Sequence, residues 1–134
     1  MKVILDANVA IASVAARGLC EAVVELCLER HALVMCEGLL AEIEEKLTRK
    51  LKVSPRIAAE FLKILRDHAE VLEPTKVEKA LCRDPDDLML LGLVEVSGAG
   101  AIITGDKDLL VIKAYKTARI VTPRAFWELN AQVR

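Results

Sequence analysis

The segment Arg83–Leu110 constrains the fold more than any other part of the chain, because acidic residues there border an apolar helix and an apolar strand. Asp84-Pro85 is a typical helix start, with Asp84 as the N-cap and the proline at the first helical position. We expect the helix to extend to about Val96 and to be packed from more than one direction, since apolar residues occupy almost every side. Asp87 heads the stripe that faces the core, so its carboxylate is predicted to point inward.

A short strand and an acidic turn follow this helix. Gly98 is expected to close the helix, and Ala101–Ile103 has the apolar composition of a buried parallel strand. The strand leads into Asp106 and Asp108, at the edge where open α/β sheets hold their sites. Asp87 is predicted to lie at the same end of the fold. The alternative interpretation is that these acids only cap helices and favour their positive ends.

The composition favours one domain over residues 1–134 with a core of its own. The chain is 54% hydrophobic but only 3% aromatic, so aliphatic side chains must fill the interior. Predicted strands alternate with predicted helices, which indicates an α/β fold with a central parallel sheet flanked by helices, an α/β/α sandwich. The formal net charge of −1 excludes nucleic-acid binding through overall charge, so phosphate contacts require a local basic patch or a bound metal.

The sequence also predicts where each element lies. Strands are expected at Lys2–Asp6, Ala32–Cys36, Val71–Leu72 and Arg119–Val121, and helices up to about Ala16, over Leu19–Arg30, over Gly38–Lys50, and after Ser54-Pro55 and Thr122-Pro123. The four cysteines lack the spacing of a zinc site. There is no signal peptide and no apolar run long enough to span a bilayer, which predicts a cytoplasmic protein without a membrane partner.

Two polar residues near the predicted acidic edge are ambiguous from the pattern alone. Asp6 emerges at the carboxyl end of the first strand, and Asn8 is interpreted as the N-cap of the helix that follows. Glu42 lies on a helix whose apolar stripe is expected to run through Leu40, Ile43, Leu47 and Leu51. This stripe leaves Glu42 to one side, so periodicity favours a solvated residue over a ligand at position 42.

The predicted gathering of Asp6, Asp87, Asp106 and Asp108 indicates a cation site. Like charges brought close together raise one another's pKa values unless a cation lies among them. Oxygen ligands without cysteine or histidine favour Mg²⁺ or Mn²⁺, and such ions can activate water and stabilise the leaving oxygen of a phosphodiester. Basic residues also cluster between Lys46 and Arg56, either as a solvated face or as a surface that tracks RNA.

Five sequence pieces in order resemble the PIN domain family, and within it the VapC-like toxin ribonucleases. The pieces are LDANV, EGLLAEIEEKL, RDPDDLMLLGL, AIITGDKDLL and VTPRAFWEL, and they span nearly the whole chain. The resemblance implies a metal-binding and catalytic quartet with one auxiliary acid and two orienting residues. The quartet is Asp6, Glu42, Asp87 and Asp106. The auxiliary acid is Asp108, and the orienting residues are Asn8 and Thr104. Ala7 stands where many members have threonine, and whether Asp84 or Asp86 shares the role of Asp87 stays open.

The same resemblance implies a function and partners. It implies cleavage of single-stranded RNA by metal-activated water, with Mg²⁺ or Mn²⁺, by the toxin of a toxin–antitoxin pair. Lys46, Arg49 and Lys107 would hold the RNA backbone, the protein would form a homodimer, and a cognate antitoxin would cover the acidic pocket. The alternative is a non-catalytic scaffold with a PIN fold that binds RNA or protein.

Two other enzyme and signalling classes fit the sequence less well. A phosphoryl-transfer domain of the haloacid dehalogenase type requires an acid at position 8, where this chain has Asn8. A receiver-type signalling domain requires a phospho-accepting aspartate on the third strand, and the region around Val71 offers none. A scaffold would have little use for all four acids, so the nuclease interpretation is preferred.

Overall fold

The computed structural model describes residues 1–131 of the chain, and the predicted domain boundary at residue 134 lies outside this range. Its centre is a six-stranded sheet with the strand order β3-β2-β1-β4-β6-β5. The strands are β1 (Lys2–Leu5), β2 (Ala32–Met35), β3 (Ala69–Val71), β4 (Ala101–Ile103), β5 (Ala114–Tyr115) and β6 (Ala118–Val121). All neighbouring strands are parallel except β5 and β6. The predicted α/β fold class is confirmed.

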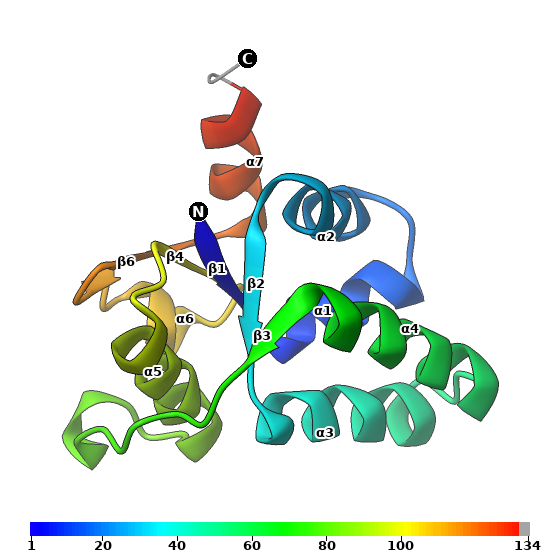
Figure 1. Ribbon diagram of the computed structural model, residues 1–134, viewed down its shortest axis with the longest axis horizontal. Helices are drawn as coiled ribbons and strands as arrows, with labels where there is room; N and C mark the ends of the chain where they lie inside the picture. The colour runs from blue at the N-terminus through cyan, green and yellow to red at the C-terminus, as the bar shows by residue number, and fades with distance from the viewer. Residues whose placement is uncertain (132–134) are drawn as a thin grey trace.

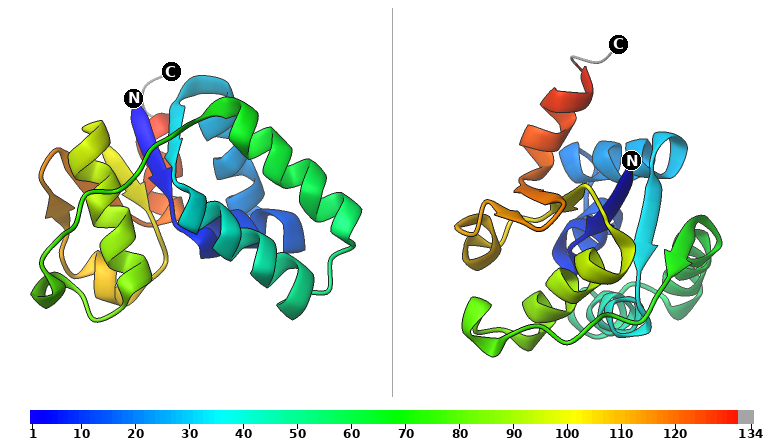
Figure 2. Two further views of the ribbon diagram at one scale, coloured as in Figure 1. Left: turned by 60° about the horizontal axis from the view of Figure 1, so that its bottom comes forward. Right: turned by 60° about the vertical axis from the view of Figure 1, so that its left-hand side comes forward.

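Seven α-helices among the described residues flank this sheet. They are α1 (Ala7–Ala15), α2 (Leu19–Arg30), α3 (Glu37–Glu45), α4 (Pro55–His68), α5 (Pro85–Ser97), α6 (Lys107–Leu110) and α7 (Pro123–Ala131). In Figure 1, α2, α3 and α4 lie to one side of strands β1–β3, and α5 lies to the other. Figure 2 shows α3 and α4 running side by side. No helix within residues 1–131 is long and apolar enough to cross a bilayer.

The central strands are buried because helices cover both faces of the sheet. Val3, Ile4 and Leu5 of β1 are fully buried, and β4 is buried along its whole length. Near-continuous apolar strands of this kind are typical of parallel sheets covered on both faces. The core is therefore built on β1 and β4, the two strands that meet in the middle of the sheet.

After β1 and after β4, the chain continues to strands that lie toward opposite edges of the sheet. The strand that follows β1 is β2, on one side of it, whereas β4 lies on the other side of β1 and is followed outward by β6. In open α/β sheets a crevice forms outside the carboxyl ends of the strands where the direction of winding changes. In this molecule that place is the carboxyl end of β1 and β4.

The structure departs from the predicted elements in three places. The sheet contains an antiparallel hairpin, β5–β6. The sequence did not predict this hairpin, because β5 is only two residues long and shows no periodicity. The third strand begins at Ala69 and ends at Val71, although the Leu72 amide still donates to the Met35 carbonyl at 2.8 Å. The third helix ends at Glu45 and continues as a π-helical turn, η1 (Lys46–Lys50).

Candidate metal centre

Three aspartates from separate elements meet at the crevice. Asp6 directly follows β1, Asp106 lies three residues beyond the end of β4, and Asp87 belongs to the first turn of α5. One carboxylate oxygen of each lies within 4.8 Å of the oxygens of the other two. Asp6 and Asp87 are only 7% and 4% exposed, and Asp106 is half-buried. The sequence prediction that these three acids come together is thus realised in the geometry.

Two of the three aspartates also cap helices. Asp6 is the N-cap of α1, and its Oδ1 atom accepts a hydrogen bond of 3.4 Å from the backbone N–H of Asn8. Asp106 is the N-cap of α6, and its Oδ1 atom accepts a hydrogen bond of 2.9 Å from the backbone N–H of Asp108. The interpretation of Asn8 as an N-cap was wrong, because Asp6 already occupies that position and α1 begins at Ala7. The capping and the cation-site interpretations of these acids are therefore compatible rather than exclusive.

Thr104 connects two of the carboxylates. Its fully buried hydroxyl donates to Asp6 Oδ2 at 2.6 Å and accepts from the Asp106 backbone N–H at 3.0 Å. A hydroxyl has one hydrogen to donate, so both sides of this bridge are determined by the geometry. The side chain of Thr104 therefore fixes the orientation of Asp6 and the backbone position of Asp106 together.

Asp87 has the most perturbed carboxyl group of the cluster. Burial raises its pKa from the ordinary 3.8 to about 7, and the neighbouring charges of Asp106 and Asp84 add to the increase. Only the thiol of Cys82, 3.6 Å from Asp87 Oδ2, acts in the opposite direction. Burial beside these acids likewise raises the pKa of Cys82 to about 11, which keeps the thiol protonated as a donor. Sequence reasoning missed Cys82, since no periodicity marks a residue in the turn before α5.

The donor set and the shape of the crevice fit a small hard cation. The three aspartates offer only carboxylate oxygens, the ligands that Mg²⁺ and Mn²⁺ prefer. The pocket has a volume of about 50 Å³, enough for an ion with a few waters, since one water needs about 10–15 Å³. It is lined by Asp6, Asn8, Leu39, Glu42, Lys46, Asp84, Asp86, Asp87, Leu90 and Asp106.

Glu42 lines this pocket but stands apart from the group of three aspartates. Its Oε2 atom accepts a hydrogen bond of 2.8 Å from Lys46 Nζ, and this bond raises the pKa of Lys46. The expectation that Glu42 is solvated was wrong. The buried stripe of α3 includes Leu39, which places Glu42 on the flank that faces the crevice, whereas Leu51 is 44% exposed.

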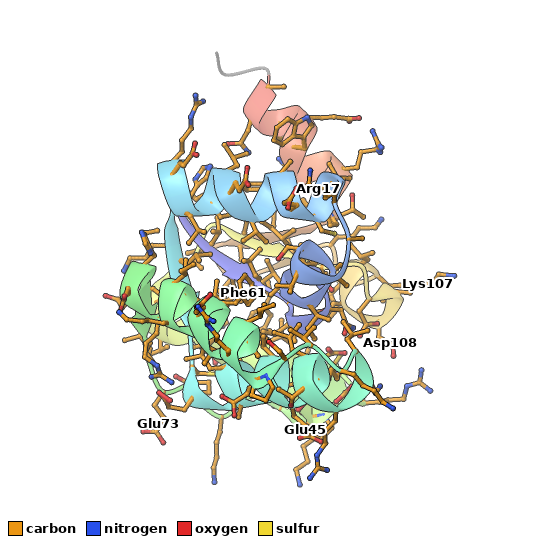
Figure 3. All side chains as sticks on the ribbon, turned by 90° about the vertical axis from the view of Figure 1, so that its right-hand side faces the viewer. Arg17, Glu45, Phe61, Glu73, Lys107 and Asp108 are labelled. Atoms are coloured by element: carbon orange, nitrogen blue, oxygen red, sulfur yellow. The ribbon has the colours of Figure 1, made fainter. Side chains whose placement is uncertain are left out.

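The remaining predicted site residues lie outside the three-aspartate group. Asp108 is exposed, and its carboxylate lies 3.4 Å from the guanidinium of Arg83. Arg49 and Lys107 are exposed and do not line the pocket. Figure 3 shows Lys107 extending away from the fold. Asp84 and Asp86 line the pocket with exposed side chains, and Asp84 also caps α5 as predicted.

Comparisons with known proteins agree with this architecture. The model of a family described as PIN domain matches residues 2–108. A chain in the crystal structure of VapBC2 from Rickettsia felis, bound to a DNA fragment from their promoter, has a TM-score of 0.62 and 14% identity. The match covers 91% of this chain and 98% of that one. PAE2754 from Pyrobaculum aerophilum has a TM-score of 0.66 and 19% identity, with 98% and 96% covered. No curated protein sequence matches the chain.

Proposed function

Because the chain belongs to the PIN domain family, we propose that it is a metal-dependent endoribonuclease that cleaves single-stranded RNA. One observation carries the proposal. Three carboxylates, two of them almost fully buried, converge within 4.8 Å of one another at the carboxyl edge of the sheet. Burying like charges together is costly without a cation, so the arrangement is best explained by a site built to bind one.

The proposal assigns roles to the residues of the pocket. Asp6, Asp87 and Asp106 hold Mg²⁺ or Mn²⁺, and Thr104 keeps two of them in position. A divalent ion bound at these residues would supply an activated water and a positive charge for the leaving oxygen of a phosphodiester. In the same proposal Glu42 is the fourth acid of the quartet, Asp108 is an auxiliary acid, and Asn8 has an orienting role.

Basic side chains around the pocket are proposed to hold the RNA backbone. Lys46 lines the pocket itself, and Arg49 and Lys107 are exposed on elements that lead away from it. Local contacts are required because the net charge of −1 gives no overall attraction for phosphate. This arrangement supports an extended strand whose scissile phosphate lies at the aspartates.

We further propose that the protein is the toxin of a toxin–antitoxin pair. The similar Rickettsia felis chain comes from a VapBC2 structure, in which the proteins are bound to their promoter DNA. A cognate antitoxin that covers the acidic pocket, a homodimer and a cytoplasmic location belong to the same proposal.

A cleavage assay with one matched pair of variants tests the nuclease. Labelled single-stranded RNA is incubated with Mg²⁺, with Mn²⁺ or with chelator, using the wild type, Asp6→Asn and Asp67→Asn. Asparagine caps helices as well as aspartate, so Asp6→Asn removes the charge without removing the cap of α1. Asp67 is an exposed acid paired with Lys63 on α4, and its variant serves as the control.

The expected result is cleavage that requires metal, disappears in Asp6→Asn and persists in Asp67→Asn. Cleavage that survives chelation, or that is undiminished in Asp6→Asn, would contradict the site. Absence of cleavage together with absence of metal binding would favour the scaffold that lacks catalysis.

A further inference from the structure

The acidic pocket contains a positive charge of its own. Six acids line it, and among the described residues Lys46 is the one lysine or arginine that does so. Its side chain is only 29% exposed and that of its partner Glu42 only 18%, so solvent screens this pair less than a typical surface ion pair. A lysine in this place lies where the pocket's negative charge is concentrated.

The ammonium of Lys46 is held on the pocket wall by two contacts. It lies 2.8 Å from Glu42 Oε2 and 3.5 Å from Asn8 Oδ1. Lys46 begins the π-helical turn η1, one turn after Glu42, and the buried Leu47 anchors that turn in the core. The backbone therefore places Lys46 within reach of Glu42, one turn away on the same face of the helix.

This pairing separates Glu42 from the three clustered aspartates. Asp6, Asp87 and Asp106 form one compact group, whereas Glu42 lies outside it with the Lys46 ammonium already attached. The three aspartates provide ligands for one divalent ion. Glu42, the fourth acid of the proposed quartet, has its charge neutralised by Lys46, so its part in the quartet is to hold that lysine.

We propose that Lys46 is a built-in second cation, so that the pocket binds one divalent ion at the three aspartates and the lysine takes the place of a second. This inference rests on the proposed function of the same site. An ammonium has three N–H donors, and two of them are directed at Glu42 and Asn8. The third is free to hold an oxygen of the scissile phosphate, as a second ion would in a two-metal site.

Removing the ammonium should therefore create a second metal site. In Lys46→Met, Glu42 loses its cation and can bind a divalent ion together with Asp86, which also lines the pocket. Calorimetric titration of the metal-free protein with Mn²⁺ counts bound ions without any substrate. We expect one ion per chain in the wild type and two in Lys46→Met. Lys46→Gln gives a second neutral variant if the methionine variant does not fold.

Two further variants make the count specific. Lys50→Met removes an exposed lysine of the same turn that does not line the pocket, and it should still bind one ion. Adding Glu42→Gln to Lys46→Met should return the count to one, since the second ion depends on the freed carboxylate. Two ions in the wild type, or one ion in folded Lys46→Met or Lys46→Gln, would overturn the proposal. No binding in the wild type would instead overturn the metal centre on which the proposed function rests.

Discussion

At the scale of single residues, the site depends on aspartates that serve the fold and the pocket together. Asp6 and Asp106 cap the helices that follow the two central strands. Their place beyond the strand ends could be predicted from the sequence, whereas the cap of α1 was assigned to Asn8 instead of Asp6. Which of Asp84, Asp86 and Asp87 turns inward was predicted from helical spacing, and Asp87 is indeed the buried one. The thiol contact of Cys82 could not be predicted, since it depends on how a turn folds back.

Replacing Thr104 with valine should weaken metal binding while preserving side-chain volume. The change removes the donor to Asp6 and the acceptor for the Asp106 amide. Losing such a supporting hydrogen bond typically lowers metal affinity about 10–100-fold. Calorimetry with Mn²⁺ measures the effect, and Thr104→Ser, which keeps the hydroxyl, should stay close to wild type. Equal affinities for the valine and serine variants would show that the hydroxyl does not position the ligands.

The raised pKa of Asp87 predicts that the metal-free protein loses stability as the pH rises. The folded state holds a proton up to pH of about 7, whereas the unfolded chain releases it near 3.9. The stabilisation is therefore complete below pH of about 4 and is lost as the pH rises through about 7. Between pH 6 and pH 8 this amounts to roughly 1 kcal/mol.

Urea unfolding in chelator at these two pH values measures the loss. Asp87→Asn cannot titrate at this position, so its stability should change less between pH 6 and pH 8 than that of the wild type. Parallel pH dependence in the two proteins would show that Asp87 does not carry the raised pKa.

At the scale of elements, α3 and α5 show what a sequence pattern can and cannot specify. The start, the end and the deep burial of α5 were predicted from its caps and its apolar sides, and Gly98 ends it with a left-handed φ of 70°. The side of α3 that faces the pocket was not predicted. The predicted buried face included Leu51 instead of Leu39, whereas in the structure Leu39 is buried and Leu51 is exposed. Glu42 was identified only through the family resemblance.

Gly92 in the middle of α5 should not tolerate a side chain. A Cβ atom there would overlap the carbonyl oxygen of Thr75 and lie 3.0 Å from Pro74 Cβ. The Thr75 amide also donates to the Gly92 carbonyl at 3.2 Å, which ties the covering segment to the helix. Alanine gains about 1 kcal/mol in helix propensity, but overpacking against backbone costs about 1–3 kcal/mol.

We therefore expect Gly92→Ala to lower the free energy of unfolding, by up to roughly 2 kcal/mol, in urea titration. Gly105→Ala is the control, because a Cβ at that position meets no atom within 4 Å. Its stability should stay within about 0.5 kcal/mol of wild type. A Gly92→Ala protein more stable than wild type would mean that the segment 72–78 can move away from α5 without lowering the free energy of unfolding.

At the scale of the whole molecule, the order of the strands places the site. The sequence predicted a parallel sheet from its alternating elements, but no local pattern reports that β4 pairs with β1 or that winding reverses between them. The antiparallel strand β5 could not be predicted either, because a segment of two residues is too short to show a hydrophobic periodicity. The reversal brings Asp6 and Asp106, a hundred residues apart, to one crevice.

Exposed basic residues outside the pocket should determine how RNA binding responds to salt. Each contact to a single-stranded phosphate contributes about 0.7 to the slope of log affinity against log salt concentration. Arg49→Ala with Lys107→Ala should therefore reduce the slope by about 1.4 in fluorescence anisotropy. The control is Lys63→Ala with Arg66→Ala, whose charges are already paired with Asp67 and Glu37. An unchanged slope in the first pair would identify Arg49 and Lys107 as ordinary solvated residues.

The central claim is that three aspartates at the reversal point of the sheet hold one divalent ion. Crystals soaked in Mn²⁺ test it most directly, because the anomalous scattering of manganese locates each bound ion. A single peak is expected in the pocket, bounded by carboxylate oxygens of Asp6, Asp87 and Asp106. An empty pocket, or manganese bound only elsewhere on the protein, would contradict it.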